Sequence, residues 1–371
     1  MNLQITPLTP LWTGNAERRG DQVLETGLLG SLRWWYEVLI RGLGYYACDP
    51  GIRSCEYTEK EKSSGICAVC QLFGCTGYAR RFRLRIEGGT DAGPLAEVKL
   101  LNPANDNHRG WRVPTLLSSP FTISFLPTRR ADLEDVYALA LRCTLRLIER
   151  YGALGGKTSH GQGAVQIQWA KDQLASKNLA DLREALVRRP CCHGENLLGA
   201  PDLRDLVGAT ILLDGQKLKA TDIWQAVRLV AAKGQNAWAP PPNSTWVPSS
   251  PAVRASLRQW LRESSNFPKL SGNLVHERHR LMGTTGTWND PQPQENRDRP
   301  KGSEIFVSHF YKVEERWTMR IFAFVPRTGN QVENGVRSLL LDPPRLKEVL
   351  GKAIALPLNV IPYPTDIELK F

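Results

Sequence analysis

The sequence of 371 residues contains no long hydrophobic run and only six histidines. No window approaches the roughly 20 apolar residues that span a bilayer, so we expect no membrane partner. The opening residues, MNLQITPLTPLW, lack a basic region followed by an apolar run. We therefore expect no signal peptide and a cytoplasmic protein.

Motifs typical of catalysis are scarce as well. His276 and His279, in HERH, have no acidic pair or third ligand at a spacing typical of a metallohydrolase. The segment YGALGGKTSHGQG (151–163) is no Walker loop, because its glycine spacing departs from G-x-x-x-x-G-K-[ST]. Neither stretch therefore predicts a catalytic residue or a site for a small-molecule substrate.

Acidic residues are outnumbered, with 37 Asp and Glu against 48 Lys and Arg and a formal net charge of +11. Such an excess favours anionic partners, above all nucleic acid, because binding releases counterions from the phosphates. A basic protein without such a partner is the plainer alternative. Some of the eleven tryptophans would suit stacking on bases, although most are expected in the core.

The hydrophobic pattern of the first half predicts the element order β-α-β-β-α-β. Residues 88–119 lack a regular pattern and are expected to be loose. The predicted elements are a strand at 1–9, a helix at 28–44, strands at 80–86 and 120–127, a helix at 131–152 and a strand at 164–169. This is the order of a split βαβ or ferredoxin-like unit.

The second half repeats this order more weakly. Its predicted elements are a strand at 205–215, helices at 220–234 and 250–264, a hairpin at 304–326 turning near Glu314 and Glu315, a helix at 343–354 and a closing strand at 366–371. Proline-rich stretches at 237–251 and 286–302 are expected to be exposed loops. We predict an α+β fold of two tandem ferredoxin-like (RRM-like) domains with insertions, divided as 1–175 and 176–371.

Five of the eight cysteines lie between Cys48 and Cys75, in an insertion at about 45–78 with few apolar residues. Disulfides are rare in the cytoplasm, so the cluster favours a metal. Cys67 and Cys70 form a C-x-x-C knuckle, and we predict structural zinc on a set of four cysteines. The set is Cys48, Cys55, Cys67 and Cys70. Cys75 is then a small buried residue, and free buried thiols or a redox role are the alternatives.

Two stretches are candidates for binding RNA phosphates. The five glycines within Gly152–Gly163 permit close backbone approach, although a glycine-rich connection before a strand has the same composition. A helix N-terminus, which attracts phosphate, lies in ETGLLGSLRWW, where Trp34 either stacks on a base or packs against the second half. The predicted RNA-binding residues of these stretches and the loop before the helix are Arg18, Arg19, Thr26, Ser31, Arg33, Trp34, Gly155, Gly156, Lys157, Ser159, His160 and Gly161.

Taken together, the stretches TPLWTGN, LLGSLRWWYEVL, CAVCQLFGCTGYARRF and LGGKTSHGQG resemble the RAMP superfamily of CRISPR proteins. More narrowly, they resemble the subunit-one family of the type III-B (Cmr) effector complex. The resemblance implies that Gly155, Gly156, Lys157 and Gly161 form the family's glycine-rich loop, and that Thr26, Ser31 and Arg33 match its loop-to-helix segment. It also implies that Arg80 and Arg81, after the LFG motif, begin a strand that faces RNA.

The resemblance further implies a non-catalytic RNA-binding subunit in antiviral defence. Such a subunit caps the backbone of the complex near the 3′ end of the guide RNA, and contacts guide RNA, target RNA and other RAMP subunits. Many relatives carry fewer cysteines in the insertion, so the zinc prediction depends on local spacing alone. The alternative is a RAMP-type endoribonuclease that processes guide RNA without metal, with His160 as general base.

Overall fold

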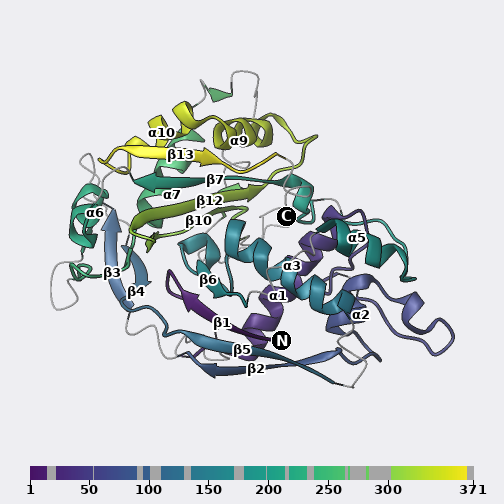
Figure 1. Ribbon diagram of the computed structural model, residues 1–371. Helices are drawn as coiled ribbons and strands as arrows, with labels where there is room; N and C mark the ends of the chain where they lie inside the picture. Colours follow the sequence, from purple (N-terminus) through teal and green to yellow (C-terminus); the bar gives the residue numbers. More distant parts are fainter. Residues whose placement is uncertain are drawn as a thin grey trace, which may run out of the picture.

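The computed structural model describes most of the chain. The described residues are 1–14, 22–52, 54–89, 95–100, 110–128, 135–170, 179–197, 199–213, 217–231, 238–263, 266–267, 281–283 and 302–365. Arg18, Arg19, His276, His279, the stretch 286–301 and the predicted closing strand at 366–371 lie outside them. Within the described part, the protein is a mixed α+β fold in which two sheets lie on either side of a pair of helices (Figure 1).

The first sheet holds the strands predicted in the first half. It has the order β2-β5-β1-β6, and every neighbouring pair is antiparallel. Its strands are β1 (Asn2–Pro7), β2 (Phe82–Gly88), β5 (Phe121–Pro127) and β6 (Val165–Gln168). Alternate side chains are buried, as in Phe82 and Leu84 against exposed Arg83 and Arg85. The predicted half-buried strand with a cationic outer face is confirmed.

Two helices, α1 (Glu25–Gly42) and α3 (Asp135–Tyr151), cover the inner face of this sheet (Figure 1). Both form because apolar side chains recur at helical spacing. All the residues predicted to face inward from α1 are buried, namely Leu28, Leu32, Trp35, Tyr36, Leu39 and Leu43. The helix begins three residues before the predicted span of 28–44 and ends at Gly42, two residues before its end, and Gly44 follows with a left-handed φ of 88°.

The second sheet follows the path β13-β7-β12-β11-β9, with β10 also paired to β12. Its strands are β7 (Leu206–Leu213), β9 (Trp246–Val247), β10 (Ile305–Val307), β11 (Phe310–Val313), β12 (Arg316–Phe324) and β13 (Leu358–Pro362). The turn between β11 and β12 falls at Glu314 and Glu315, both with left-handed φ, so the predicted hairpin is confirmed. Helices α7 (Ser250–Trp260), α9 (Gln331–Leu341) and α10 (Pro343–Gly351) share a hydrophobic core with this sheet.

The other face of the second sheet packs on α1. The ring of Trp34 lies 5.5 Å from that of Phe324, and the ring of Trp35 lies 5.9 Å from that of Phe322. Arg320 on β12 also donates a hydrogen bond to the carbonyl of Gly152, 3.1 Å away, just after α3. Helix α1 therefore lies between the two sheets, and the core cluster that it belongs to also contains Phe322 of the second sheet.

Two stretches differ from what the sequence predicted. Residues 88–119, expected to be loose, contain β3 (Leu95–Leu100) and β4 (Gly110–Pro114), and the helix expected at 220–234 stops as α6 (Ala220–Ala226) before β8 (Leu229–Ala231). The three strands form a sheet of order β4-β3-β8 that joins the two halves. Strand pairing between distant segments decided these conformations, and local pattern does not reveal it.

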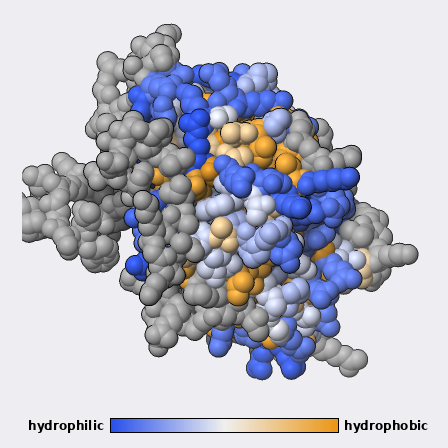
Figure 2. Space-filling model, turned by 90° about the vertical axis from the view of Figure 1, so that its left-hand side faces the viewer, coloured by the Kyte–Doolittle hydropathy of each residue, from blue (hydrophilic) through white to orange (hydrophobic). Residues whose placement is uncertain are grey.

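A further helix, α5 (Leu179–Val187), lies beyond the predicted domain boundary and packs on α3 in the core of the first half. The boundary at residue 175 and the tandem ferredoxin-like description stay predictions. The face that carries β3, β4 and α6 has a mostly hydrophilic described surface (Figure 2). No helix in the described part of the chain is both long and apolar enough to cross a membrane.

Candidate metal centre and nucleic-acid interface

Four cysteine sulfurs converge in the insertion. Those of Cys48, Cys55, Cys67 and Cys70 all lie within 4.8 Å of one another, the four predicted as ligands. Cys48 Sγ is 3.4 Å from Cys70 Sγ and 3.7 Å from Cys67 Sγ. A tetrahedral ion with metal–sulfur bonds of about 2.3 Å holds its ligands about 3.8 Å apart, whereas a disulfide needs about 2.05 Å. The spacing fits one tetrahedral ion.

Local structure aims these sulfurs at one point. Cys67 is the N-cap of the short helix α2 (Ala68–Phe73), and its sulfur accepts a hydrogen bond from the N–H of Cys70, 3.5 Å away. The sulfur of Cys55 accepts from the N–H of Cys67 at 3.4 Å. Hydrogen bonding, with Cys48 as the largest cause, lowers the pKa of the Cys67 thiol to about 7. In the absence of a metal ion, hydrogen bonding with the other three cysteines raises the pKa of Cys70. Deprotonated thiols are the form that binds metal.

Cys75 lies outside this group of four. It is partly buried, and its backbone N–H and carbonyl both pair with Tyr78 at 3.0 Å. A second segment, which the sequence did not single out, closes over the knuckle. The N–H of Cys192 donates to the carbonyl of Ile66 at 3.2 Å, and Gln71 Nε2 donates to the carbonyl of Pro190 at 2.9 Å. The insertion is therefore packed between α1 and residues 190–192.

Arg33, predicted to contact RNA, points into the cysteine cluster. Its guanidinium donates to the sulfur of Cys70 at 3.4 Å and to that of Cys48 at 3.7 Å. Trp34, its neighbour, packs against the second half, which is the second of the two alternatives left open by the sequence. The loop-to-helix segment thus places these two side chains on protein, while Thr26 is exposed on the first turn of α1.

The glycine-rich loop is held against the segment TPLWT and against α1. The N–H of Gly155 donates to Ser31 Oγ at 2.9 Å, and that of Gly156 donates to the carbonyl of Trp12 at 2.6 Å. The ammonium of Lys157 lies 4.1 Å from the centre of the Trp12 ring, a cation–π contact. Ser31 and Lys157 thus both lie at this loop, Ser31 through Gly155 and Lys157 over Trp12, a residue to which the sequence gave no role.

The glycines are required by contacts within the protein. Gly155 has φ of 83°, and a Cβ there would lie 2.7 Å from the carbonyl oxygen of Trp12. Gly161 has φ of 101°, and a Cβ there would lie 2.6 Å from the ring of His309. The N–H of Gly163 donates to the carbonyl of Pro10 at 2.9 Å. In the described chain, no hydrogen bond uses the loop N–H groups from Lys157 to Ser159, so these groups are the loop's available backbone donors.

Two histidines flank this loop. The side chain of His160 is exposed at the surface, yet its ring is partly desolvated by the protein around it. This desolvation, followed by the charges of Arg254 and Lys157, lowers the pKa of His160 to about 4. His309 is fully buried, and its Nδ1 accepts from the N–H groups of Ser249 and Ser250 at 3.2 and 3.3 Å. Burial lowers the pKa of His309 to about 3. Both rings are therefore neutral at pH 7.

The two arginines after the LFG motif differ in their surroundings. The guanidinium of Arg81 donates to the carbonyl of Gln71 at 2.9 Å and lies 4.8 Å from the ring centre of Tyr137. Arg80 is half-buried, and its carbonyl accepts from Thr128 Oγ1 at 3.1 Å. Arg81 therefore fastens α2 to the sheet in this structure, and its contact with RNA stays a prediction.

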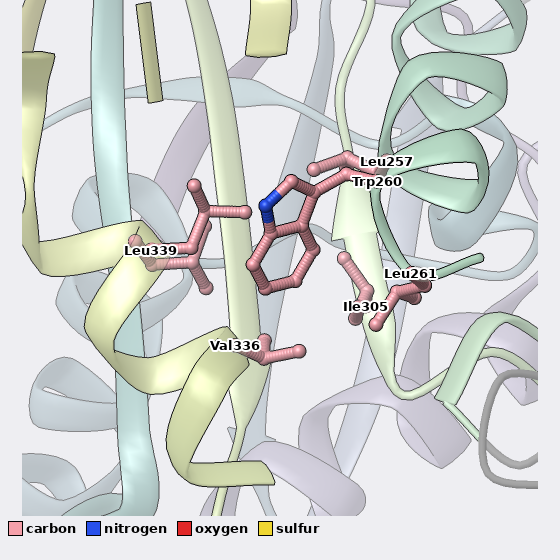
Figure 3. Close-up of a pocket in the computed structure, with 7 residues that line it drawn as sticks. Leu257, Trp260, Leu261, Ile305, Val336 and Leu339 are labelled. Atoms are coloured by element: carbon pink, nitrogen blue, oxygen red, sulfur yellow. The ribbon is translucent and has the colours of Figure 1, made fainter. Parts of the chain in front are cut away.

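The described chain contains a small cavity in the second core (Figure 3). It is lined by Leu257, Trp260, Leu261, Ile305, Val336, Leu339 and Leu340. Its volume of about 10 Å³ is close to that of one water-sized sphere, and every lining residue is hydrophobic. The cavity is a gap in the packing between α7 and α9.

The first half of the chain matches a known protein family. Residues 4–166 match the model of the RAMP superfamily, a span that includes the cysteine insertion and the glycine-rich loop. The first part of the chain is therefore similar to RAMP-superfamily proteins. The match agrees with the resemblance of its motifs to that superfamily. Among curated proteins, no sequence matches.

Among solved structures, the chain is similar to Cmr1 from Pyrococcus furiosus in its apo form, with 12% identity and a TM-score of 0.43, covering 97% of each chain. A chain of the type III-B Cmr-beta complex bound to cognate target RNA and AMPPnP has 10% identity and a TM-score of 0.44, covering 92% of this chain and 98% of that one. Another, from that complex bound to cognate target RNA, has 11% identity and a TM-score of 0.43, covering 94% and 99%.

Proposed function

We propose that this protein is an RNA-binding subunit of a type III-B CRISPR (Cmr) effector complex. In this proposal it caps the backbone near the 3′ end of the guide RNA and contacts guide RNA, target RNA and neighbouring RAMP subunits. The RAMP-superfamily match of residues 4–166, the motifs that they contain and the net charge of +11 support it. The observation that carries it is the glycine-rich loop, whose Lys157 is fixed over Trp12 beside the available backbone donors.

The loop suits contact with phosphates better than with base edges. Backbone N–H groups and a lysine ammonium recognise phosphate oxygens without regard to sequence. Burial lowers the pKa of Lys157, but the cation–π contact with Trp12 favours its charged form. We expect affinity to depend mainly on charge, to fall steeply with salt and to vary little with RNA sequence.

A binding role fits the loop better than cleavage. A general base works best when its pKa lies near the operating pH, and that of His160 is lowered to about 4. An imidazole with such a pKa accepts a proton from a ribose hydroxyl poorly. The RAMP-type endoribonuclease remains the second candidate, since His160 and Lys157 both belong to this loop.

We also propose that the four-cysteine cluster binds zinc. Four thiolates at tetrahedral spacing are the donor set of structural zinc sites. The ion would be held by Cys48, Cys55, Cys67 and Cys70 and would supply stability to the insertion, with no position open for chemistry. The few apolar residues of the insertion support this role.

RNA binding is tested by titrating labelled single-stranded and guide–target RNA at several salt concentrations. Lys157→Ala should weaken binding by about 1 kcal/mol, equally for all sequences, and reduce the salt slope by about one. Lys62→Ala is the matched control, because Lys62 is also exposed with a left-handed φ but lies in the insertion. Equal losses in both variants would contradict the role of the loop.

Cleavage is tested in the same samples. In EDTA, the wild-type protein should leave RNA intact, and His160→Ala should change neither integrity nor affinity appreciably. Metal-independent cleavage that disappears in His160→Ala would overturn the binding role in favour of the endoribonuclease.

A further inference from the structure

We propose that Arg33 is a positioning residue of the metal centre, holding the sulfurs of Cys48 and Cys70 and offsetting the charge of the four thiolates. The inference rests on the proposal that the cluster binds a divalent metal. It assigns Arg33 to the metal, although its position in the sequence matched a segment expected to contact RNA.

The orientation of Arg33 is fixed at all three of its nitrogens. Nη2 donates to Cys70 Sγ at 3.4 Å and to Cys48 Sγ at 3.7 Å. Nη1 donates to the carbonyl of Gly74 at 3.0 Å, and Nε donates to Glu37 Oε1 at 3.0 Å. The side chain is only 19% exposed. A planar guanidinium makes this set of contacts, whereas a lysine ammonium could make only part of it.

The charges on this side of α1 are partly offset when thiolates are present. Glu37 lies between two arginines, with its carboxylate 3.0 Å from Arg33 Nε and 3.4 Å from Arg41 Nη2. These three side chains carry a net charge of +1, and both Glu37 and Arg41 are buried. Uncompensated charge is costly there. A divalent ion with four thiolates carries a net charge of −2, so the three side chains offset one of these two charges.

The same row of side chains ties the metal ligands to the helix. Arg41 Nη2 also contacts the carbonyl of Ala47 at 3.4 Å, directly before Cys48, and Arg41 Nη1 donates to the carbonyl of Pro201 at 3.1 Å. Arg33 and Arg41, joined through Glu37, therefore hold Cys48 from two sides, Arg33 at its sulfur and Arg41 at the carbonyl before it. Groups that hold metal ligands in this way commonly change metal affinity by roughly 10- to 100-fold when removed.

The test measures zinc affinity of the full-length protein by competition with a chromophoric chelator. We expect Arg33→Gln to raise the dissociation constant at least tenfold and Arg33→Lys to raise it less. Arg85→Gln is the matched control, because it removes the same charge from the exposed face of β2, where Arg85 pairs with Glu87. Cobalt-substituted protein gives a second readout, since the thiolate-to-metal absorption band should shift in Arg33→Gln and stay unchanged in the control.

The outcomes separate this inference from the one on which it rests. Wild-type protein that binds no metal would overturn the metal centre itself. Wild-type protein that binds zinc, with equal affinity and an unshifted cobalt band in Arg33→Gln, would overturn only the role of Arg33. If Arg33→Gln does not fold, Arg33→Lys decides by the same two readouts, and values equal to wild type would refute the inference.

Discussion

The cysteine insertion and the glycine-rich loop are both marked by unusual composition, yet the structure treats them differently. In the insertion, the four predicted cysteines converge on one point, because ligand chemistry and local spacing together define a tetrahedral site. In the loop, most glycines face the protein itself, at Trp12 and His309. A cluster of cysteines at this spacing thus favours one class of ligand, a metal ion. A run of glycines shows only that another group lies close to the backbone.

The sharpest test of the insertion removes the knuckle. Cys67→Ser together with Cys70→Ser should reduce bound metal from about one ion per chain to none, since two ligands cannot hold a tetrahedral site. Elemental analysis measures the loss, and hydrogen exchange should show residues 45–80 opening while the two sheets stay protected. Cys143→Ala, which removes a buried sulfur from α3 outside the cluster, should keep the metal. Metal-free wild-type protein whose insertion is protected from hydrogen exchange would contradict a structural role for the metal.

The loop is tested by comparing two of its glycines. Gly161→Ala should destabilise the protein by about 2 kcal/mol, because it combines a left-handed φ with a Cβ 2.6 Å from the buried ring of His309. Gly156→Ala should cost less, since φ is not left-handed there and the nearest atom, 2.9 Å away, belongs to the ring of Trp12. Denaturant unfolding measures both. Equal destabilisation by the two substitutions would contradict the view that packing against His309 requires glycine at position 161.

The last expected effect is a pH dependence of stability, which is small near neutral pH. The pKa of His309 falls from an ordinary value near 6.5 to about 3, so the unfolded state binds the proton first as pH falls. Its contribution is therefore fully present above about pH 6.5 and is lost on acidification, at up to about 1.4 kcal/mol per pH unit. His309→Asn keeps an acceptor for Ser249 and Ser250 and should flatten the slope between pH 7 and 5. If the slope of stability against pH is unchanged in this variant, a group other than His309 causes the pH dependence.

Sequence reasoning succeeded where the signal is local. The inward face of α1, the alternation in β2 and the turn at Glu314 follow from periodicity and turn chemistry within a few residues. It failed where distant segments decide the outcome. Pairing of β3 with β8 depends on residues more than a hundred positions apart. For the same reason, no local pattern shows that Arg33 points toward Cys70 or that the ring of His309 packs against Gly161 of the glycine-rich loop.

The sheet β4-β3-β8 has a consequence for how the chain folds during synthesis. Strand β3 finds its partner β4 within a few residues, but its other edge is completed only by residues 229–231. Strand β3 therefore leaves the ribosome with one edge open, and about 130 further residues must be made after Leu100 before that edge is covered. A ribosome that pauses between these segments would leave exposed an edge that invites pairing with another chain.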